Sequence, residues 1–95
     1  MRLFEVNDKT GRIIYLTEER WRHILFKHPN LISELETIKR TLLYPSCILQ
    51  DPRNLSIHSY FGHCKNKPEP FLAVVVKYIN GEGFILTSFY TDQTK

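Results

Sequence analysis

The most constraining feature of this sequence is a change in the spacing of its apolar residues near Pro45. Between Thr17 and Pro45, apolar residues recur every three or four positions, which is typical of helices that pack one side against a core. After Pro45, β-branched and aromatic residues gather in short runs separated by turn formers, which is typical of strands. Because both patterns need a shared core, we expect one α+β domain spanning residues 1–95.

The N-terminal residues predict a β-hairpin ahead of the helices. Two short apolar runs, Leu3–Val6 and Arg12–Leu16, flank the turn-forming stretch Asn7–Gly11. Such a stretch reverses the chain and allows the two runs to pair.

A first helix is expected to begin after Thr17 and to end near His28. The Thr17 hydroxyl can accept a hydrogen bond from the first turn, where acidic residues also suit the helix dipole. Pro29 disfavours helical geometry in the residue before it. Helix spacing relates the residues of the expected buried stripe, which are Trp21, Ile24, Leu25 and His28.

A second helix is expected to have Ser33 as its N-cap, or to start a few residues before Ser33, and to stop before Pro45. Ser33 and Glu36 fit a capping box, in which each side chain caps the other's backbone N–H. The expected buried stripe consists of Leu31, Leu35, Ile38 and Leu42.

Four strands are expected after Pro45, at Cys47–Gln50, Ile57–Phe61, Phe71–Tyr78 and Phe84–Tyr90, with a loop at His63–Pro70. The expected fold is therefore α+β, with an N-terminal β-hairpin and two helices packed on a mostly antiparallel four- to five-stranded sheet. The helices should cover one face of the sheet and leave the other to solvent or a ligand.

Strict alternation along the last two strands assigns side chains to faces. It groups Lys77 with Phe71, Ala73 and Val75, and separates Phe84, Leu86, Ser88 and Tyr90 from Ile85, Thr87 and Phe89. A lysine near a strand end can stabilise a developing oxyanion, or it can be an edge charge that blocks aggregation. The hydroxyls near the C-terminus can serve chemistry or only favour strand formation.

The first helix carries a second, basic face. Arg20, His23 and Lys27 share it and Arg22 lies near it, so it could bind a phosphate backbone or simply be solvated. His28, at the expected C-terminus of the helix, could act as a general acid or pack beside Pro29 as a capping residue.

Composition limits the function classes. The 95 residues carry a formal net charge of +3, which permits a nucleic-acid partner without requiring one. No apolar run is long enough to span a membrane, and the N-terminus is typical of a strand rather than of a signal peptide. We expect a cytoplasmic protein in which Cys47 and Cys64 are reduced thiols.

No cofactor or metal is expected. His58, His63 and Cys64 are close in sequence, but no second ligand pair with metal-site spacing supports them. Cys64 beside His63 is not a nucleophile pattern either, because adjacent strand residues point apart. Nucleotide-binding and zinc-protease motifs are absent from the sequence.

Several segments nevertheless resemble a family of small phage and bacterial proteins. Leu16–Ile24 followed by Lys27–Pro29 resembles the family's opening "LTxERWxHI…HP". Later segments are similar to "TLxxP", "I-x-x-D" and "VVVK…GFIxTAY", at Thr41–Pro45, Ile48–Asp51, Val74–Lys77 and Gly83–Tyr90. The family is placed in the barnase–EndoU–colicin–RelE superfamily of small nucleases, which share a helices-then-sheet fold.

The resemblance implies metal-independent RNA cleavage with the 2′-hydroxyl of the RNA as nucleophile. Carried over by position, the implied catalytic residues are His23, His28, Lys77, Thr87 and Tyr90. Ser88 stands where the pattern has alanine. We expect the residues that bind RNA to be Arg20, Arg22, Lys27 and Tyr60.

One departure from the family leaves the activity open. The strand after the aspartate tends to contain Tyr-Tyr-Arg, whereas this chain has Tyr60–His63 without an arginine. Either His63 or Lys65 substitutes, or the protein cleaves poorly or not at all. The expected function is an endoribonuclease that acts as the toxin of a toxin–antitoxin pair, and the alternative is a non-catalytic RNA- or protein-binding module. Expected partners are RNA and an antitoxin, with a homodimer as a further arrangement and no membrane.

Overall fold

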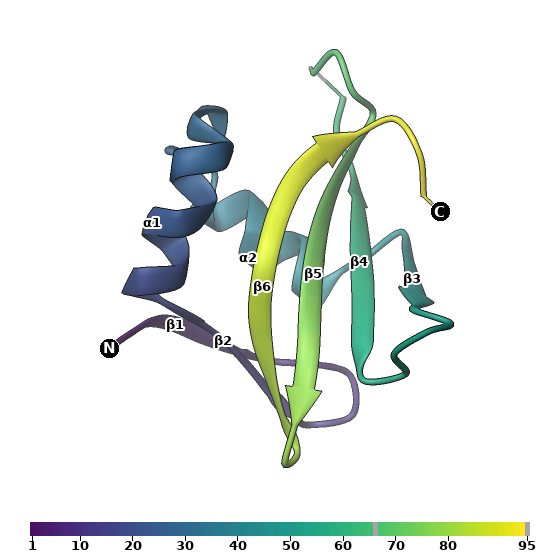
Figure 1. The fold of residues 1–95 in the computed structure, drawn as a ribbon. Coiled ribbons are helices and arrows are strands. Elements are labelled where there is room, and N and C mark those ends of the chain that lie inside the picture. Colours follow the sequence, from purple (N-terminus) through teal and green to yellow (C-terminus); the bar gives the residue numbers. More distant parts are fainter. Residues whose placement is uncertain (66, 95) are drawn as a thin grey trace.

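The computed structural model describes residues 1–65 and 67–94, and these residues form a six-stranded sheet with helices beside it (Figure 1). In chain order the elements are β1 (Arg2–Asn7), β2 (Ile13–Thr17), α1 (Glu18–Lys27), a 3-10 helix η1 (Pro29–Leu31), α2 (Leu35–Leu43), β3 (Cys47–Gln50), β4 (Ile57–His63), β5 (Phe71–Ile79) and β6 (Glu82–Thr91).

The strand order is β1-β2-β6-β5-β4-β3. The predicted α+β class and the N-terminal hairpin are confirmed, and the sheet has six strands rather than the predicted four to five. The hairpin belongs to the sheet, because β2 lies parallel to β6 and pairs Ile14 with Gly83 and Tyr15 with Phe84. Glycine permits this approach, since a Cβ at Gly83 would lie 2.9 Å from the side chains of Ile14 and Val76.

Helix α1 follows the sequence prediction at both ends. The Thr17 hydroxyl accepts a hydrogen bond from the backbone N–H of Arg20 at 3.1 Å, so Thr17 is the N-cap. The helix ends at Lys27, and His28 closes it by donating its backbone N–H to the carbonyl of Ile24 at 2.7 Å.

The predicted start of the second helix was wrong. Helix α2 begins at Leu35, and its N-cap position is held by Glu34 without a side-chain capping bond. The backbone N–H of Glu34 donates to the carbonyl of Leu31 at 2.9 Å, which closes a turn and holds Ser33 outside the helix. The Ser33–Glu36 capping box therefore does not form.

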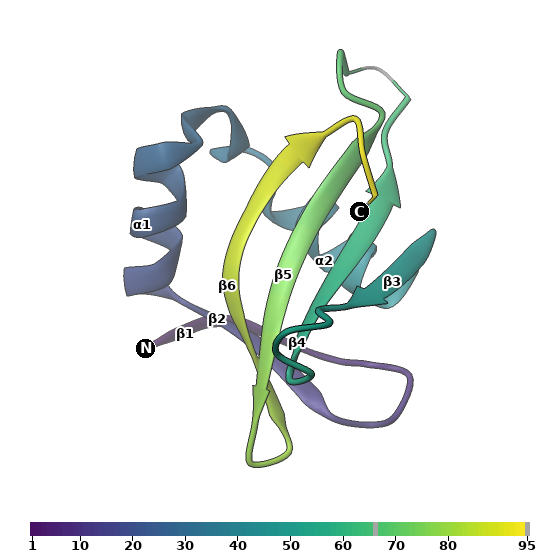
Figure 2. The ribbon, with the colours of Figure 1, turned by 45° about the vertical axis from the view of Figure 1, so that its right-hand side comes forward.

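One face of the sheet is covered by helices and the other is not. Figure 2 shows α2 behind β4 and β5, with α1 alongside β6. The core lies between α2 and the covered face and includes the fully buried Ile38, Leu72, Val74, Val76 and Ile85. Within the described residues, no helix has both the length and the apolar character needed to cross a bilayer.

A β-bulge changes the predicted faces of β6. Val76 pairs with Ile85 whereas the preceding Val75 pairs with Thr87, so Leu86 is an extra residue in β6. Strict alternation therefore fails at this point. Phe84 shares its face with Thr87 and Phe89, and Ile85 shares the covered face with Ser88 and Tyr90.

The covered face holds a connected polar network beside the core. The hydroxyl groups of Tyr60 and Tyr78 are hydrogen-bonded to each other, and the Tyr78 hydroxyl also donates to the Asp8 carboxylate at 3.0 Å. Asp8, whose side chain is 4% exposed, also accepts from Thr10 and from the backbone and side chain of Arg12. Arg12 lies over the Tyr78 ring at 3.8 Å from its centroid.

Candidate functional site

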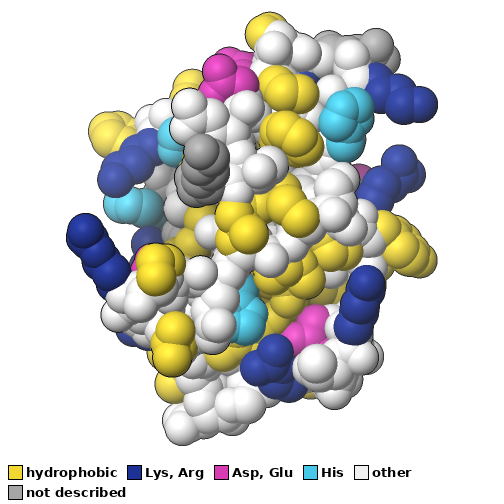
Figure 3. Space-filling model, turned by 90° about the vertical axis from the view of Figure 1, so that its right-hand side faces the viewer, with side chains coloured by type: hydrophobic (Ala, Val, Ile, Leu, Met, Phe, Trp, Pro, Cys, Tyr) yellow, Lys and Arg dark blue, Asp and Glu magenta, His cyan; other side chains and the backbone are white. Residues whose placement is uncertain are grey.

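The uncovered side of the sheet, called here the open face, presents side chains in rows that cross the strands. Register assigns to these rows Tyr15, Phe84, Lys77 and Ile57; then Thr87, Val75, Ser59 and Leu49; then Phe89, Ala73, Phe61 and Cys47; and last Thr91, Phe71 and His63. Figure 3 views the molecule from the side of β3 and shows hydrophobic side chains in the middle, with lysine, arginine and histidine side chains around them.

A hollow of about 480 Å³ lies on the part of this face nearest β3. Its lining includes Leu49, Phe61 and Phe89 together with residues of the β3–β4 loop and the C-terminal segment. Phe61 lines the hollow and is only 5% exposed, so it forms an apolar floor that is packed into the protein.

Helix α1 runs along the edge of the open face beside β6. At its start, the Arg20 guanidinium lies 5.4 Å from the centroid of the Phe84 ring. Beyond its end, the ring centroids of His28 and Phe89 are 6.0 Å apart. The basic side of α1 therefore borders the open face from one end of β6 to the other.

A shallow groove of about 450 Å³ joins the two elements. Arg20, His23 and Phe84 line it together with Thr17 and Glu19, so one carboxylate shares the groove with the basic side chains. Phe84 is the direct cross-strand neighbour of Lys77 in β5, so the lysine side chain leaves the sheet next to the same ring. Two cations and a histidine, from α1 and from β5, therefore surround one aromatic residue.

The structure divides the predicted catalytic residues between the two faces of the sheet. Lys77 and Thr87 lie on the open face, and His23 and His28 border it from α1. Tyr90 lies on the covered face opposite Leu72 and packs against the core, so the structure does not bring it to the others.

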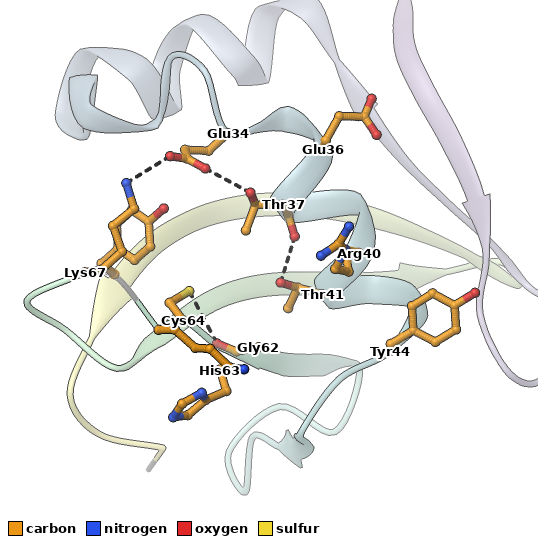
Figure 4. Close-up of a pocket in the computed structure, with 12 residues that line it drawn as sticks. Glu34, Glu36, Thr37, Arg40, Thr41, Tyr44, Gly62, His63, Cys64 and Lys67 are labelled. Atoms are coloured by element: carbon orange, nitrogen blue, oxygen red, sulfur yellow. Dashed lines mark hydrogen bonds and ion pairs between the residues drawn. The ribbon is translucent and has the colours of Figure 1, made fainter.

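Tyr90 lines a separate cavity of about 440 Å³ between α2 and β4 (Figure 4). Glu34 is placed there by hydrogen bonds from Thr37 at 2.9 Å and from Lys67 at 3.1 Å. The Tyr90 hydroxyl is buried and lacks a partner with normal hydrogen-bond geometry. Burial and the nearby negative charge of Glu34 raise the pKa of Tyr90 to about 12.

Three of the four residues predicted to bind RNA are accessible. Arg20 lines the groove, and Arg22 and Lys27 are exposed on α1. Among the described residues, none of these three side chains, nor that of Lys77, makes an ion pair or a side-chain hydrogen bond. Their charges are free to meet a phosphate.

Tyr60 does not fit the predicted role in RNA binding. It is 3% exposed, and its hydroxyl is bound to Tyr78 inside the covered face. A base needs an accessible ring face for stacking, and the ring of Tyr60 is buried in the core, so Tyr60 cannot stack on a base in this structure. The two residues considered as substitutes for the missing arginine both line the cavity of Tyr90, and neither lines the groove of His23. They are His63, whose ring also packs against Phe71, and Lys65.

Sequence reasoning missed two residues of this site, Tyr15 and Phe84. They become neighbours through the parallel pairing of β2 with β6, which no local pattern reveals. Within the described residues, no three histidine, cysteine or acidic side chains form a cluster suited to a metal ion. Both cysteines are free thiols, and burial raises the pKa of Cys64.

Comparison of the chain with protein-family models, with curated proteins and with solved structures found no match.

Proposed function

We propose that this chain is a metal-independent endoribonuclease that binds RNA along α1 and the open face. One observation carries the proposal, namely that Arg20 and His23 of α1 and Lys77 of β5 flank the same residue, Phe84. A histidine in the same groove as an unpaired arginine, with an unpaired lysine on the next strand, suits RNA cleavage, which needs proton transfer and stabilisation of charge on the phosphate.

In the proposed reaction the 2′-oxygen of a ribose attacks the adjacent phosphorus while a base removes its proton. The bond from phosphorus to the 5′-oxygen of the next nucleotide breaks, and an acid returns a proton to that oxygen. His23, which lines the groove with Arg20, transfers one of these protons, and the resemblance implies that His28, which lies beside Phe89 farther along β6, transfers the other. Arg20 and Lys77 stabilise the negative charge that develops on the phosphorane oxygens. The products carry 2′,3′-cyclic phosphate and 5′-hydroxyl ends.

The resemblance of Leu16–Ile24 and Lys27–Pro29 to the small-nuclease family supports the same proposal, because these motifs form α1 and its C-terminal end. By the same resemblance, we propose that the protein acts in the cytoplasm as a toxin whose antitoxin covers α1 and the open face.

The test is incubation of purified protein with labelled RNA in excess EDTA. We expect fragments with 2′,3′-cyclic phosphate ends, and we expect His23→Ala to lower the cleavage rate about 100-fold or more because proton transfer is lost. Phe26→Ala is the matched control, since Phe26 is an exposed residue of the same helix and lies outside the groove. Intact RNA after long incubation at high protein concentration would exclude the nuclease.

A second function, RNA binding without cleavage, is favoured by one observation. Tyr90, whose position matches the final strand motif of the family, lies on the covered face away from His23. If its hydroxyl were required for chemistry, the protein would bind RNA but leave it intact. Salt-dependent RNA binding in the absence of any cleavage product would identify this function.

A further inference from the structure

Tyr15 and Phe84 form an aromatic pair on the open face beside the groove of His23. They are register neighbours on β2 and β6, and their ring centroids are 5.5 Å apart with the planes tilted by 57°. Both residues are only partly buried. The face of the Tyr15 ring that the Arg2 guanidinium covers becomes available to a base only when the guanidinium moves aside.

Each ring of the pair is also held by an arginine. The Arg2 guanidinium lies 3.7 Å from the centroid of the Tyr15 ring, and it is anchored by Glu5 at 2.7 Å and by Glu82 at 3.0 Å. Arg20 lies over Phe84 at the other end. The row Arg2, Tyr15, Phe84, Arg20 is therefore continuous and held at both ends.

The charges around this row are not all balanced. Arg2 is neutralised by its two glutamates, whereas Arg20 and Lys77 lack ion-pair partners among the described residues. An arginine whose only task is to cover apolar surface at the edge of the sheet can be neutralised within the protein, as Arg2 is by Glu5 and Glu82. Two unpaired cations next to Phe84 instead suit a ligand that combines flat rings with negative charge.

We infer that Tyr15 and Phe84 are a stacking platform for unpaired bases, and that the protein binds single-stranded RNA in preference to duplex RNA. This inference rests on the proposed RNA-binding function and specifies its substrate. Bases inside a duplex have both faces covered by their neighbours, so only an unpaired or displaced base can stack on a protein ring. Arg20 and Lys77 would then contact the phosphates that flank the stacked base.

The test compares binding of a short single-stranded RNA and of a hairpin duplex of equal length, measured by fluorescence anisotropy. Both RNAs carry 2′-O-methyl groups, which remove the nucleophile and prevent cleavage. We expect tighter binding to the single strand. We expect Phe84→Leu to weaken single-strand binding about 5- to 100-fold, as loss of one stacked base would, and Phe84→Tyr to retain it.

Salt dependence separates stacking from charge. Phe84→Leu should leave the slope of log affinity against log salt unchanged. Lys77→Ala should make that slope shallower by the amount that corresponds to about one phosphate contact. Tyr15→Leu provides an independent second variant if Phe84→Leu fails to fold by circular dichroism, and we expect it to weaken single-strand binding in the same way.

Equal affinity for both RNAs, or unchanged affinity in the folded leucine variants, would overturn the stacking platform while leaving RNA binding intact. Failure of the wild-type protein to bind either RNA would instead overturn the proposed function itself.

Discussion

The two faces of the sheet differ in whether their polar side chains have partners within the protein. On the covered face, Asp8, Tyr60 and Tyr78 are bound to one another and to Arg12, so their polar atoms satisfy each other. Lys77 lies on the open face and Arg20 on its border, and neither has an ion-pair partner among the described residues. One set of polar residues is already used by the fold, and the other remains available.

This difference separates stability from function in a small domain. A buried charge that loses its partners is costly, so the covered face should tolerate few changes. Arg20 and Lys77 are only partly buried and have no ion-pair partner among the described residues, so their charges contribute little to folding and are available to a ligand. Substitutions on the two faces should therefore affect different measurements.

The largest expected effect on stability is that of Asp8→Ala. This change removes the acceptor shared by Thr10, Arg12 and Tyr78. The backbone N–H groups of Thr10 and Arg12 lose their partner, and the Tyr78 hydroxyl keeps only its bond with Tyr60. We expect the free energy of unfolding to fall by about 2–4 kcal/mol, measured by urea denaturation. A loss below about 0.5 kcal/mol would show that the network does not hold the fold, and the contrast between the faces would be broken.

A smaller effect is expected from acid. Burial alone would raise the pKa of Asp8, but hydrogen bonds from Thr10, Arg12 and Tyr78 bring it below its usual value. A carboxylate with a lowered folded pKa stabilises the fold above its unfolded pKa, which is about 3.9, and this stabilisation is lost as pH falls through the folded pKa. The urea midpoint should therefore decrease below about pH 4.

Comparison with Asp8→Asn isolates this contribution, because the variant cannot titrate at position 8. Its urea midpoint should fall less steeply below pH 4 than that of the wild type. Glu34→Gln is the matched variant, since the pKa of Glu34 is also lowered, mainly by its hydrogen bond from Thr37. Identical acid profiles for wild type and Asp8→Asn would assign the acid sensitivity to Glu34 or to other groups.

The smallest effect on stability is expected from Lys77→Ala on the open face. We expect the free energy of unfolding to change by less than about 0.5 kcal/mol, because Lys77 has no partner to lose. The same variant should bind single-stranded RNA about tenfold more weakly at low salt, as loss of a phosphate contact would. Lys9→Ala, in the exposed turn between β1 and β2, is the control that should change neither quantity.

Local signals in the sequence predicted much of the fold. Thr17 and Pro29 delimit α1 through bonds and clashes within a few residues, and the turn at Asn7–Gly11 predicted the β1–β2 hairpin for the same reason. The capping box at Ser33 was also a local signal, but the turn from Leu31 to Glu34 competed with it and formed instead.

The candidate site was less accessible to sequence reasoning because its key contacts are long-range. His23 and Arg20 were found from helix spacing, which is local. The pairing of Tyr15 with Phe84 depends on which strands become neighbours, and Gly83, which permits it, resembles any turn glycine in the sequence. The sequence around Tyr60 does not reveal that its hydroxyl bonds to Tyr78 inside the fold, so nothing in the sequence argued against its role in RNA binding.

The bulge at Leu86 makes the open face depend on which residue of β6 is left out of the strand pairing. Upstream of it the side chains of β6 follow one alternation, and downstream they follow the opposite one. Loss of this single residue would leave Thr87 and Phe89 on the open face and Ser88 and Tyr90 on the covered face, because Thr87 would then follow Ile85 in regular alternation. If Leu86 instead took the place that Thr87 holds opposite Val75, every later side chain of β6 would change face. The chemistry that β6 displays to solvent therefore depends on which residue the bulge leaves out of the strand pairing.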